Sequence, residues 1–413
     1  MPEKSIAIIG AGVVGASTAL ALQKDGHDVT LLDREGPCAG ASFGNAGVIV
    51  NGSCAPTAMP GILLDALRMF TQPLPPLSIR AAYLPRILPW LIRFVVESQP
   101  SRVSRNAENL HALTRHAVKG WRQLTDNTKL TSLLDDNGWL KVYESRRSFD
   151  ATANARELMD RLGTPYELLS GQEIQDIEPN LAPIFSHGIL QRDSLGIINP
   201  QKMIQGMVDL FTSGGGAYRQ FDVQAININN EGVALYNSQK VISADKVVIA
   251  AGAWSRPLAK QIGDDVPLES EGGYHLMLPV ESRDLLLRPV VNGEASFVLS
   301  PMETGLRMTS QIELGGLDCM PDYRRVRSLL PVVKRMLPDI EIAEKSVWMG
   351  FRPSLPDSLP VLGFATHTDK VLYAFGHQHL GMTMGPISGL VIADLLASRK
   401  PEIDLAPYRA DRF

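Results

Sequence analysis

The chain has 413 residues and a formal net charge of −4, and 45% of its residues are hydrophobic. This length exceeds one ordinary hydrophobic core, so we expect two closely packed domains, and the slight negative charge argues against a nucleic-acid partner. The three cysteines, Cys38, Cys54 and Cys319, lack the paired spacing of a zinc site or a disulfide framework, which suits a reducing compartment.

The first residues of the chain predict a strand–helix–strand unit. An apolar strand over residues 5–9 runs into Gly10-Ala11-Gly12-Val13-Val14-Gly15, and a helix of small residues follows over 16–22. A second strand over 27–32 ends at Asp33. A G-x-G-x-x-G turn between a strand and a helix, with an acid closing the next strand, is the fingerprint of dinucleotide binding.

Each residue of this fingerprint has a physical role. Gly10 permits the tight turn, Gly12 lets the backbone approach a pyrophosphate, and Gly15 lets the helix lie close to the strand. The helix N-terminus offers free N–H groups to the pyrophosphate, and Asp33 can accept both hydroxyls of a ribose. The alternative is the same unit with a tight turn and no ligand.

Two unusual segments follow. Residues 36–52 include Ser42-Phe43-Gly44-Asn45-Ala46-Gly47, a density of small residues that leaves backbone N–H groups open to a ligand. Residues 59–96 are apolar, broken by prolines, and carry Trp90 with Arg68, Arg80, Arg86 and Arg93. Such a segment is typical of a peripheral membrane contact with arginines toward lipid headgroups. The alternative is a pair of short helices that pack on the protein itself.

The same patterns bear on localisation. No secretion leader is visible, and the apolar runs are shorter than the roughly 18 residues of a transmembrane helix. We therefore expect a cytoplasmic protein that contacts the inner face of the cytoplasmic membrane, if at all, peripherally.

The middle of the chain alternates helices and strands. The predicted helices cover residues 106–126, 149–162 and 200–211, and the predicted strands cover 138–143, 188–190 and 195–198. Residues 244–255 form an apolar strand that ends in Ala250, Ala251 and Gly252, which fits the centre of a parallel sheet. The sheet that begins at residue 5 is thus completed more than 200 residues later, which disfavours a simple nicotinamide dehydrogenase.

The last third of the chain predicts a second sheet and a return to the first. Residues 271–309 read as an antiparallel sheet, joined by the strands near residues 139 and 189. A basic amphipathic helix is expected over 322–336. A strand over 371–375 then enters a glycine-rich turn over 376–386, which opens a final helix over 387–396.

Four blocks now resemble a known family. They are the fingerprint with Asp33, residues 42–47, the strand at 247–255, and residues 350–363 together with the turn at 376–386. These blocks resemble the FAD-dependent amine and amino-acid oxidoreductases related to D-amino-acid oxidase. The likeness is greatest to the bacterial D-amino-acid dehydrogenases of the small-subunit type, and it covers essentially the whole chain.

The resemblance implies a mixed α/β fold. A Rossmann-like FAD-binding domain would be interleaved with a substrate domain built on a mixed antiparallel sheet. The expected FAD-binding parts are residues 1–55, part of 140–260, and 345–413. Residues 56–139 would be a helical, apolar insertion, and 160–200 with 261–344 would form the substrate domain.

The resemblance also implies a reaction. Hydride leaves the carbon that bears the amine for flavin N5, and the imine hydrolyses to a 2-oxo acid and ammonia. The substrate would be a D-amino acid or a secondary amino acid, and the electrons would pass to a quinone or another respiratory-chain component. FAD is expected to bind noncovalently, because none of the cysteines lies in the Gly350-Phe351-Arg352-Pro353 block.

An anionic substrate needs a fixed cation, and arginine holds a carboxylate with two charge-assisted bonds. Arg352 is the candidate, with a structural arginine as the alternative. Tyr274 resembles the family's substrate-side tyrosine, although an ordinary strand tyrosine would fit too, and His275 on the other face is predicted to be a packed histidine. His377 and His379 are predicted to line the active site, and without acidic or cysteine partners they predict no metal site.

The turn before the last helix offers backbone N–H groups that can stabilise negative charge on a reduced flavin. By resemblance, residues 42–47 lie along the flavin and Val223 meets the adenine. The predicted FAD-binding residues are Gly10, Gly12, Val13, Val14, Gly15, Asp33, Arg34, Ser42, Asn45, Ala46, Gly47, Val223, Ala250, Gly252, Gly381, Met382 and Thr383.

Two other functions remain open. One is a dehydrogenase or oxidase for a secondary amine such as D-hydroxyproline, D-proline or sarcosine, for which oxygen could be the acceptor. The other is a flavoprotein that holds FAD as a docking module without turnover, which Arg352 in its motif disfavours.

Overall fold

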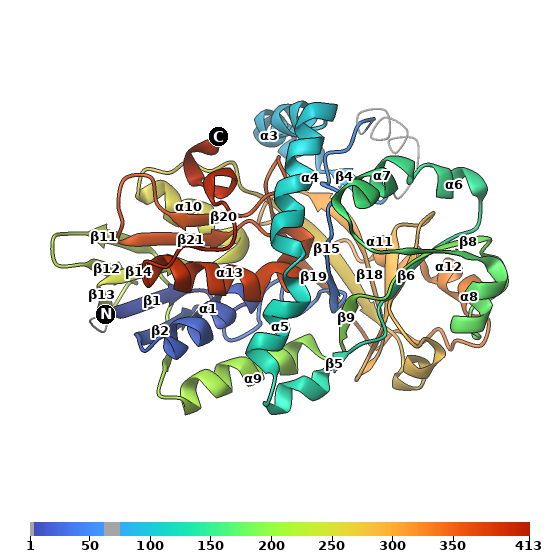
Figure 1. Ribbon diagram of the computed structural model, residues 1–413, viewed down its shortest axis with the longest axis horizontal. Coiled ribbons are helices and arrows are strands. Elements are labelled where there is room, and N and C mark those ends of the chain that lie inside the picture. The colour runs from blue at the N-terminus through green and yellow to red at the C-terminus, as the bar shows by residue number, and fades with distance from the viewer. Residues whose placement is uncertain (1–3, 62–74) are drawn as a thin grey trace.

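The computed structural model describes residues 4–61 and 75–413, and these form two lobes, each built on a large sheet (Figure 1). The part of the apolar 59–96 segment that includes Arg68 lies outside the described residues. The helices α4 (Pro100–Thr114) and α5 (Ala117–Thr125) cross the middle of the view between the lobes.

The first lobe contains a six-stranded sheet that is parallel except at one edge. Its order is β10 (Ala217–Gln220), β2 (Asp28–Asp33), β1 (Ser5–Ile9), β14 (Lys246–Ile249), β21 (Val371–Phe375) and β20 (Val361–Phe364). β1 pairs with β14 in parallel, Ile6 opposite Lys246, whereas β20 runs antiparallel to β21. This pairing confirms the prediction that the sheet begun at residue 5 is completed far along the chain.

Both faces of this sheet are covered, which explains why its central strands are continuously apolar. Ile6 and Ile8 of β1 join the core under the helices α1 (Val13–Lys24), α9 (Pro200–Ser213) and α13 (Gly381–Leu396). Ala7 and Ile9 face the opposite core, which is closed by α10 (Ser255–Gln261) and a three-stranded antiparallel sheet. The strands of that sheet are β11 (Ala225–Ile228), β12 (Val233–Tyr236) and β13 (Val241–Ala244).

Helices α1 and α13 cross at very short range. A methyl group at Gly389 would lie 2.7 Å from the backbone carbon of Ser17 and 2.8 Å from the nitrogen of Thr18. Of the described helices, only the one over Gln378–Leu396 is long and apolar enough to cross a membrane by length and composition, and 67% of an apolar 18-residue stretch within it is buried inside the protein. The apolar character of α13 is thus used in the core, where it packs on α1.

The second lobe contains the mixed sheet that the sequence predicted. β15 (Glu269–Met277) lies between β19 (Ser346–Ser354) and β18 (Gly305–Leu314), and most neighbours are antiparallel. The order continues from β18 through β17 (Phe297–Met302), β16 (Val290–Asn292), β6 (Trp139–Tyr143) and β8 (His187–Gln191) to β7 (Glu167–Ser170). The parallel exceptions are the pairs of β16 with β6 and of β18 with β4 (Leu77–Ile79).

Two details of this lobe differ from the prediction. The helix expected over 322–336 is two short helices, α11 (Arg324–Arg327) and α12 (Leu330–Met336), because Pro331 can open a helix but cannot continue one. In addition, β19 pairs with β15, so this stretch of the predicted 345–413 FAD-binding segment lies in the substrate sheet.

The remaining elements surround the junction of the lobes. A small sheet joins β3 (Val48–Val50), β9 (Ser194–Ile197) and β5 (Leu134–Asp135). The helix predicted over 106–126 is interrupted between α4 and α5, and that over 149–162 is divided into α6 (Arg146–Asp150) and α7 (Ala153–Leu162). Ser170 forms a capping box with Glu173 at the start of α8 (Gly171–Ile177). The helix α3 (Leu84–Glu97) lies at the rim of the molecule (Figure 1).

We predict that Gly389→Ala lowers the free energy of unfolding by about 1–3 kcal/mol, because the added methyl group forces α13 away from the α1 backbone. Gly196→Ala is the control, since its methyl group would meet its nearest neighbour, Asp135 Cβ, at an ordinary 3.4 Å. Urea unfolding measures both. Equal stabilities of the two variants would contradict the close crossing.

Candidate active site

A cavity of about 1070 Å³ lies between the two lobes, at the carboxyl ends of β1, β2 and β14. In this sheet β2 and β14 flank β1 on opposite sides, so the cavity opens at the point where the strand order reverses, the usual ligand site of such sheets. One end of the cavity is lined by Gly10, Gly12 and Asp33, and the other by Arg352 and Lys141. The same cavity is therefore lined both by the dinucleotide fingerprint and by the predicted substrate arginine, which are far apart in the sequence.

The fingerprint end has the expected backbone. Gly10 has φ +108°, and a side chain there would meet the carbonyl of Ala250. Asp33 at the end of β2 fixes the turn: its Oδ2 accepts the N–H of Ala11 at 2.8 Å, and its Oδ1 accepts those of Glu35 and Gly36 at 2.9 Å. The carboxylate therefore joins the turns that follow β1 and β2, and Asp33 also lines the cavity.

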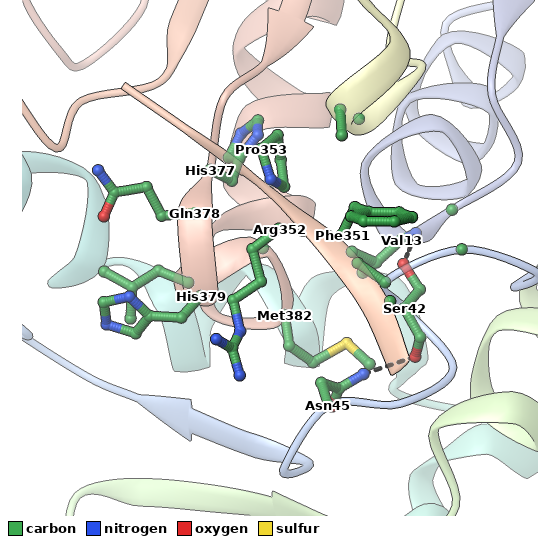
Figure 2. Close-up of a pocket in the computed structure, with 18 of the residues that line it drawn as sticks. Val13, Ser42, Asn45, Phe351, Arg352, Pro353, His377, Gln378, His379 and Met382 are labelled. Carbon is green, nitrogen blue, oxygen red and sulfur yellow. Dashed lines mark hydrogen bonds between the residues drawn. The ribbon is translucent and has the colours of Figure 1, made fainter. Parts of the chain in front are cut away.

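The start of α1 is capped from a distant loop. Ser42 Oγ accepts the N–H of Val13 at 2.9 Å, while Asn45 donates to the Ser42 carbonyl and accepts the N–H of Gly47 (Figure 2). Gly12, the N-cap of α1, has no side chain between this loop and the helix. The arrangement leaves a small-residue cradle at a helix N-terminus, the chemistry that binds a pyrophosphate.

The second lobe also holds this loop, a feature that the sequence analysis missed. Arg307 on β18 donates to the carbonyls of Phe43 and Asn45, both at 2.9 Å, and Ser300 on β17 donates to that of Ala46 at 2.7 Å. Burial lowers the pKa of Arg307 to about 10, so it stays charged at neutral pH. Residues 42–47 are thus bonded to both lobes.

Arg352 stands on β19 with its guanidinium in the cavity (Figure 2). Its Nη1 donates to the Gln311 carbonyl at 3.0 Å. The group lies directly over Gly273 of β15, where a methyl group would be 2.4 Å from the guanidinium carbon. The glycine at 273 therefore makes room for the arginine.

An acidic group accompanies this cation. Glu271 is opposite Arg352 in the β15–β19 register, lines the cavity and is buried. Burial raises the pKa of Glu271, and the nearby guanidinium opposes that rise. Sequence reasoning missed Glu271, although its spacing of two from Gly273 would have placed both residues on one face of a strand.

The two predicted histidines have different surroundings. The His377 ring hydrogen-bonds Ser388 of α13 at 2.8 Å, and burial lowers its pKa to about 3. The side chain of His379 lies on the same side of the β19 strand as the Arg352 guanidinium (Figure 2). The side chain of His379 is exposed to the cavity, but the surrounding protein still desolvates it, and this desolvation, followed by the positive charges of Arg352 and Lys141, lowers the pKa of His379 to about 4. Both imidazoles are neutral at pH 7 and line the cavity.

Tyr274 corrects the prediction of a substrate-side tyrosine. Its side chain is fully buried on the far side of β15, donates to Glu313 and accepts the N–H of Asp322. The strand alternation that brings Gly273 into the cavity turns Tyr274 away from it. His275 is packed as expected, stacked on Trp348 with ring centroids 5.2 Å apart.

The start of α13 faces the same cavity. No side chain caps its N-terminus, and the first turn, which contains Gly381, Met382 and Thr383, lines the cavity. Thr383 is tied to β3 by the N–H of Val50, and the carbonyl of Met382 accepts the indole N–H of Trp121 at 2.7 Å. The positive end of the helix dipole is therefore fixed toward an anionic ligand.

Every predicted FAD-binding residue except Gly15 lines this cavity. Gly15 acts in packing, since a methyl group there would lie 1.7 Å from the carbonyl oxygen of Gly10. Three consecutive residues that line the cavity, Thr309, Ser310 and Gln311, each have a buried side-chain oxygen with no hydrogen-bond partner among the described residues. The cavity also includes residues that the sequence analysis did not single out, namely Trp139, Lys141, Gln191, Trp254 and Glu271.

Comparison with known proteins agrees with this geometry. A model of the DAO family, described as FAD dependent oxidoreductase, matches residues 5–395, and the chain belongs to that family. It is 34% identical over the full length of both chains to a protein named D-amino-acid oxidase from Bradyrhizobium diazoefficiens. It is 30% identical, over 99% of each chain, to a D-amino acid dehydrogenase of Rhizobium rhizogenes.

A solved structure supports the fold. The glycine oxidase of Geobacillus kaustophilus superimposes with a TM-score of 0.76 at 23% identity, over 99% of each chain. The predicted mixed α/β flavoprotein fold and the FAD cofactor are therefore confirmed. The protein is an FAD-dependent oxidoreductase of the class that acts on amines or amino acids.

We predict that Asp33→Ala weakens FAD binding by about 10–100-fold, because three backbone N–H groups lose a charged acceptor and the turn at Ala11 loosens. Asp28→Ala is the matched control, since Asp28 opens the same strand and is exposed. Fluorescence titration of the apoprotein with FAD measures both affinities. A wild-type affinity in Asp33→Ala would contradict this role.

Proposed function

We propose that this protein oxidises a D-amino acid to the 2-oxo acid and ammonia and passes the electrons to a membrane quinone. The observation that carries the proposal is the Arg352 guanidinium, seated over Gly273 and facing the cavity. Its guanidinium has one hydrogen-bond acceptor among the described residues, the Gln311 carbonyl, so its other N–H groups can donate to a substrate carboxylate. The names of the two relatives at 30% identity or more support the D-configuration.

Bound FAD supplies the two-electron oxidation, and the chain's own groups bind and orient the substrate. Arg352 holds the carboxylate, and Glu271 is the acidic group beside it that faces the amine. Neutral His379 closes this part of the cavity without adding a third positive charge. The uncapped first turn of α13 provides positive potential for the negative charge that arrives with the electrons.

The reaction is tested by mixing the holoenzyme anaerobically with D-amino acids, their L-enantiomers and secondary amino acids, and following the flavin absorbance near 450 nm. We expect bleaching by D-amino acids. Bleaching by L-enantiomers alone, by secondary amines alone, or by none of them would contradict the proposal. Reoxidation by a quinone analogue but not by air supports a dehydrogenase, and rapid reoxidation by air would instead make it an oxidase.

We predict that Arg352→Met raises the KM for the D-amino acid about 100-fold or more, because the charge-assisted bonds to the carboxylate are lost. Arg192→Met, which removes an exposed arginine paired with Glu167, is the control and should leave KM unchanged. Steady-state assays with an artificial dye measure both. An unchanged KM in Arg352→Met would show that the carboxylate binds elsewhere.

The membrane part of the proposal rests on α3. This helix exposes an apolar stripe, with Leu84, Leu88, Ile92 and Val95 between 37% and 58% accessible. Arg86 and Arg93 are exposed on the same helix and complement anionic headgroups. Its opposite side packs on the protein through Ile87 and Trp90, against Leu314 of β18.

We predict that the Leu88→Ser/Ile92→Ser variant binds vesicles containing phosphatidylglycerol at least about tenfold more weakly than the wild type, because two exposed apolar side chains are lost from the stripe. The control is Leu168→Ser/Leu287→Ser, which alters two leucines that are each 50% exposed outside α3. Vesicle co-sedimentation measures binding, and equal effects of the two variants would contradict a contact through α3.

A further inference from the structure

Part of the cavity lining has no role in the proposed reaction. It includes Trp139 and Lys141 on β6, Gln191 on β8, Met159 on α7, and the loop around Cys54. Trp139 and Lys141 are two residues apart on one strand and face the cavity, while Leu140 and Val142 between and beyond them belong to the buried core. The alternation of side chains along β6 therefore points Lys141 into the cavity.

Lys141 is a positive charge in an unusual place. Its Nζ lies 4.6 Å from the centre of the Trp139 ring, within range of a cation–π contact, and the indole N–H is already donated to Gln191 at 3.0 Å. Burial lowers the pKa of Lys141, which shows that its surroundings do not fully replace water.

Among residues 4–61 and 75–413, the only acidic group that acts on Lys141 is the thiol of Cys54. Burial raises the pKa of Cys54 to about 11, so this thiol is protonated and neutral at pH 7. Glu271, an acid that lines the same cavity, is instead influenced by Arg352. Within the described part of the chain, the lysine thus has no carboxylate partner, whereas Arg352 has Glu271 nearby.

We propose that Lys141 binds a second carboxylate at the end of the substrate side chain, so that the preferred substrates are dicarboxylic amino acids. The inference rests on the proposed function for the reaction itself. The cavity then presents two cations to one ligand: Arg352 for the carboxylate next to the amine, and Lys141 for the distal one. A substrate with an apolar side chain leaves the Lys141 charge unpaired, which disfavours its binding.

The first test measures binding without turnover. Glutarate and valerate have the same five carbons and one shared carboxylate, but glutarate ends in a second carboxylate and valerate in a methyl group. Each is titrated into the oxidised holoenzyme, and the change in the flavin spectrum is followed. We expect tighter binding of glutarate in the wild type, and Lys141→Met should lose about 10–100-fold in glutarate affinity without weakening valerate.

Two further variants make this result specific. Lys141→Arg keeps the charge and should keep the preference for glutarate, which also guards against a general failure of Lys141→Met to fold. Lys129→Met removes an exposed lysine outside the cavity and should behave as the wild type. Equal affinities of the wild type for glutarate and valerate, or a preference unchanged in Lys141→Met, would overturn the proposal.

The second test uses D-glutamate and D-norvaline, which differ in the same way. We expect faster anaerobic bleaching with D-glutamate at subsaturating concentrations, and a reversed order in Lys141→Met. If D-norvaline is oxidised and Lys141→Met affects both substrates equally, the role of Lys141 is wrong while the proposed reaction stands. If neither compound bleaches the flavin, the proposed reaction fails, and the glutarate-to-valerate ratio still decides the role of Lys141.

Discussion

The structure depends on how residues 42–47 are held between the lobes. Ser42 caps the start of α1, and Arg307 and Ser300 bind the carbonyls of the same loop from the second sheet. A short segment of small residues thereby connects the N-terminal fingerprint with the strands that carry Arg352 and Glu271. Because Arg307 is buried and charged, separating the lobes would leave its guanidinium N–H groups without their carbonyl acceptors, a cost that holds the two lobes together at the cofactor cavity.

Electrostatics then divides the cavity into regions. Asp33 carries negative charge at the fingerprint end, whereas at the other end Arg352, Lys141 and the positive end of the α13 dipole outweigh the acid Glu271. The two histidines near the positive end remain neutral, because burial and the neighbouring cations oppose their protonation. An anionic substrate is therefore attracted to the end of the cavity where the reactive part of the cofactor is expected.

The sequence predicted the elements that have local signals. The fingerprint, the late central strand at β14 and the sheet of the second lobe follow from periodicity, glycine spacing and family likeness. The sequence did not show which side chains of β15 point into the cavity. The prediction therefore included Tyr274 and omitted Glu271, because a strand buried on both faces shows no alternation of polarity. Arg307 and Lys141 were missed for a related reason, since their roles depend on contacts between segments distant in the chain. Family motifs located the cofactor, whereas the groups around the substrate come from strands whose orientation only the structure shows.

Gly273 has an evolutionary consequence. The guanidinium of Arg352 occupies the space where any other residue at position 273 would place its Cβ, so a side chain there displaces the guanidinium. A relative that replaces this glycine is therefore expected to hold its arginine in another position or to replace the arginine as well.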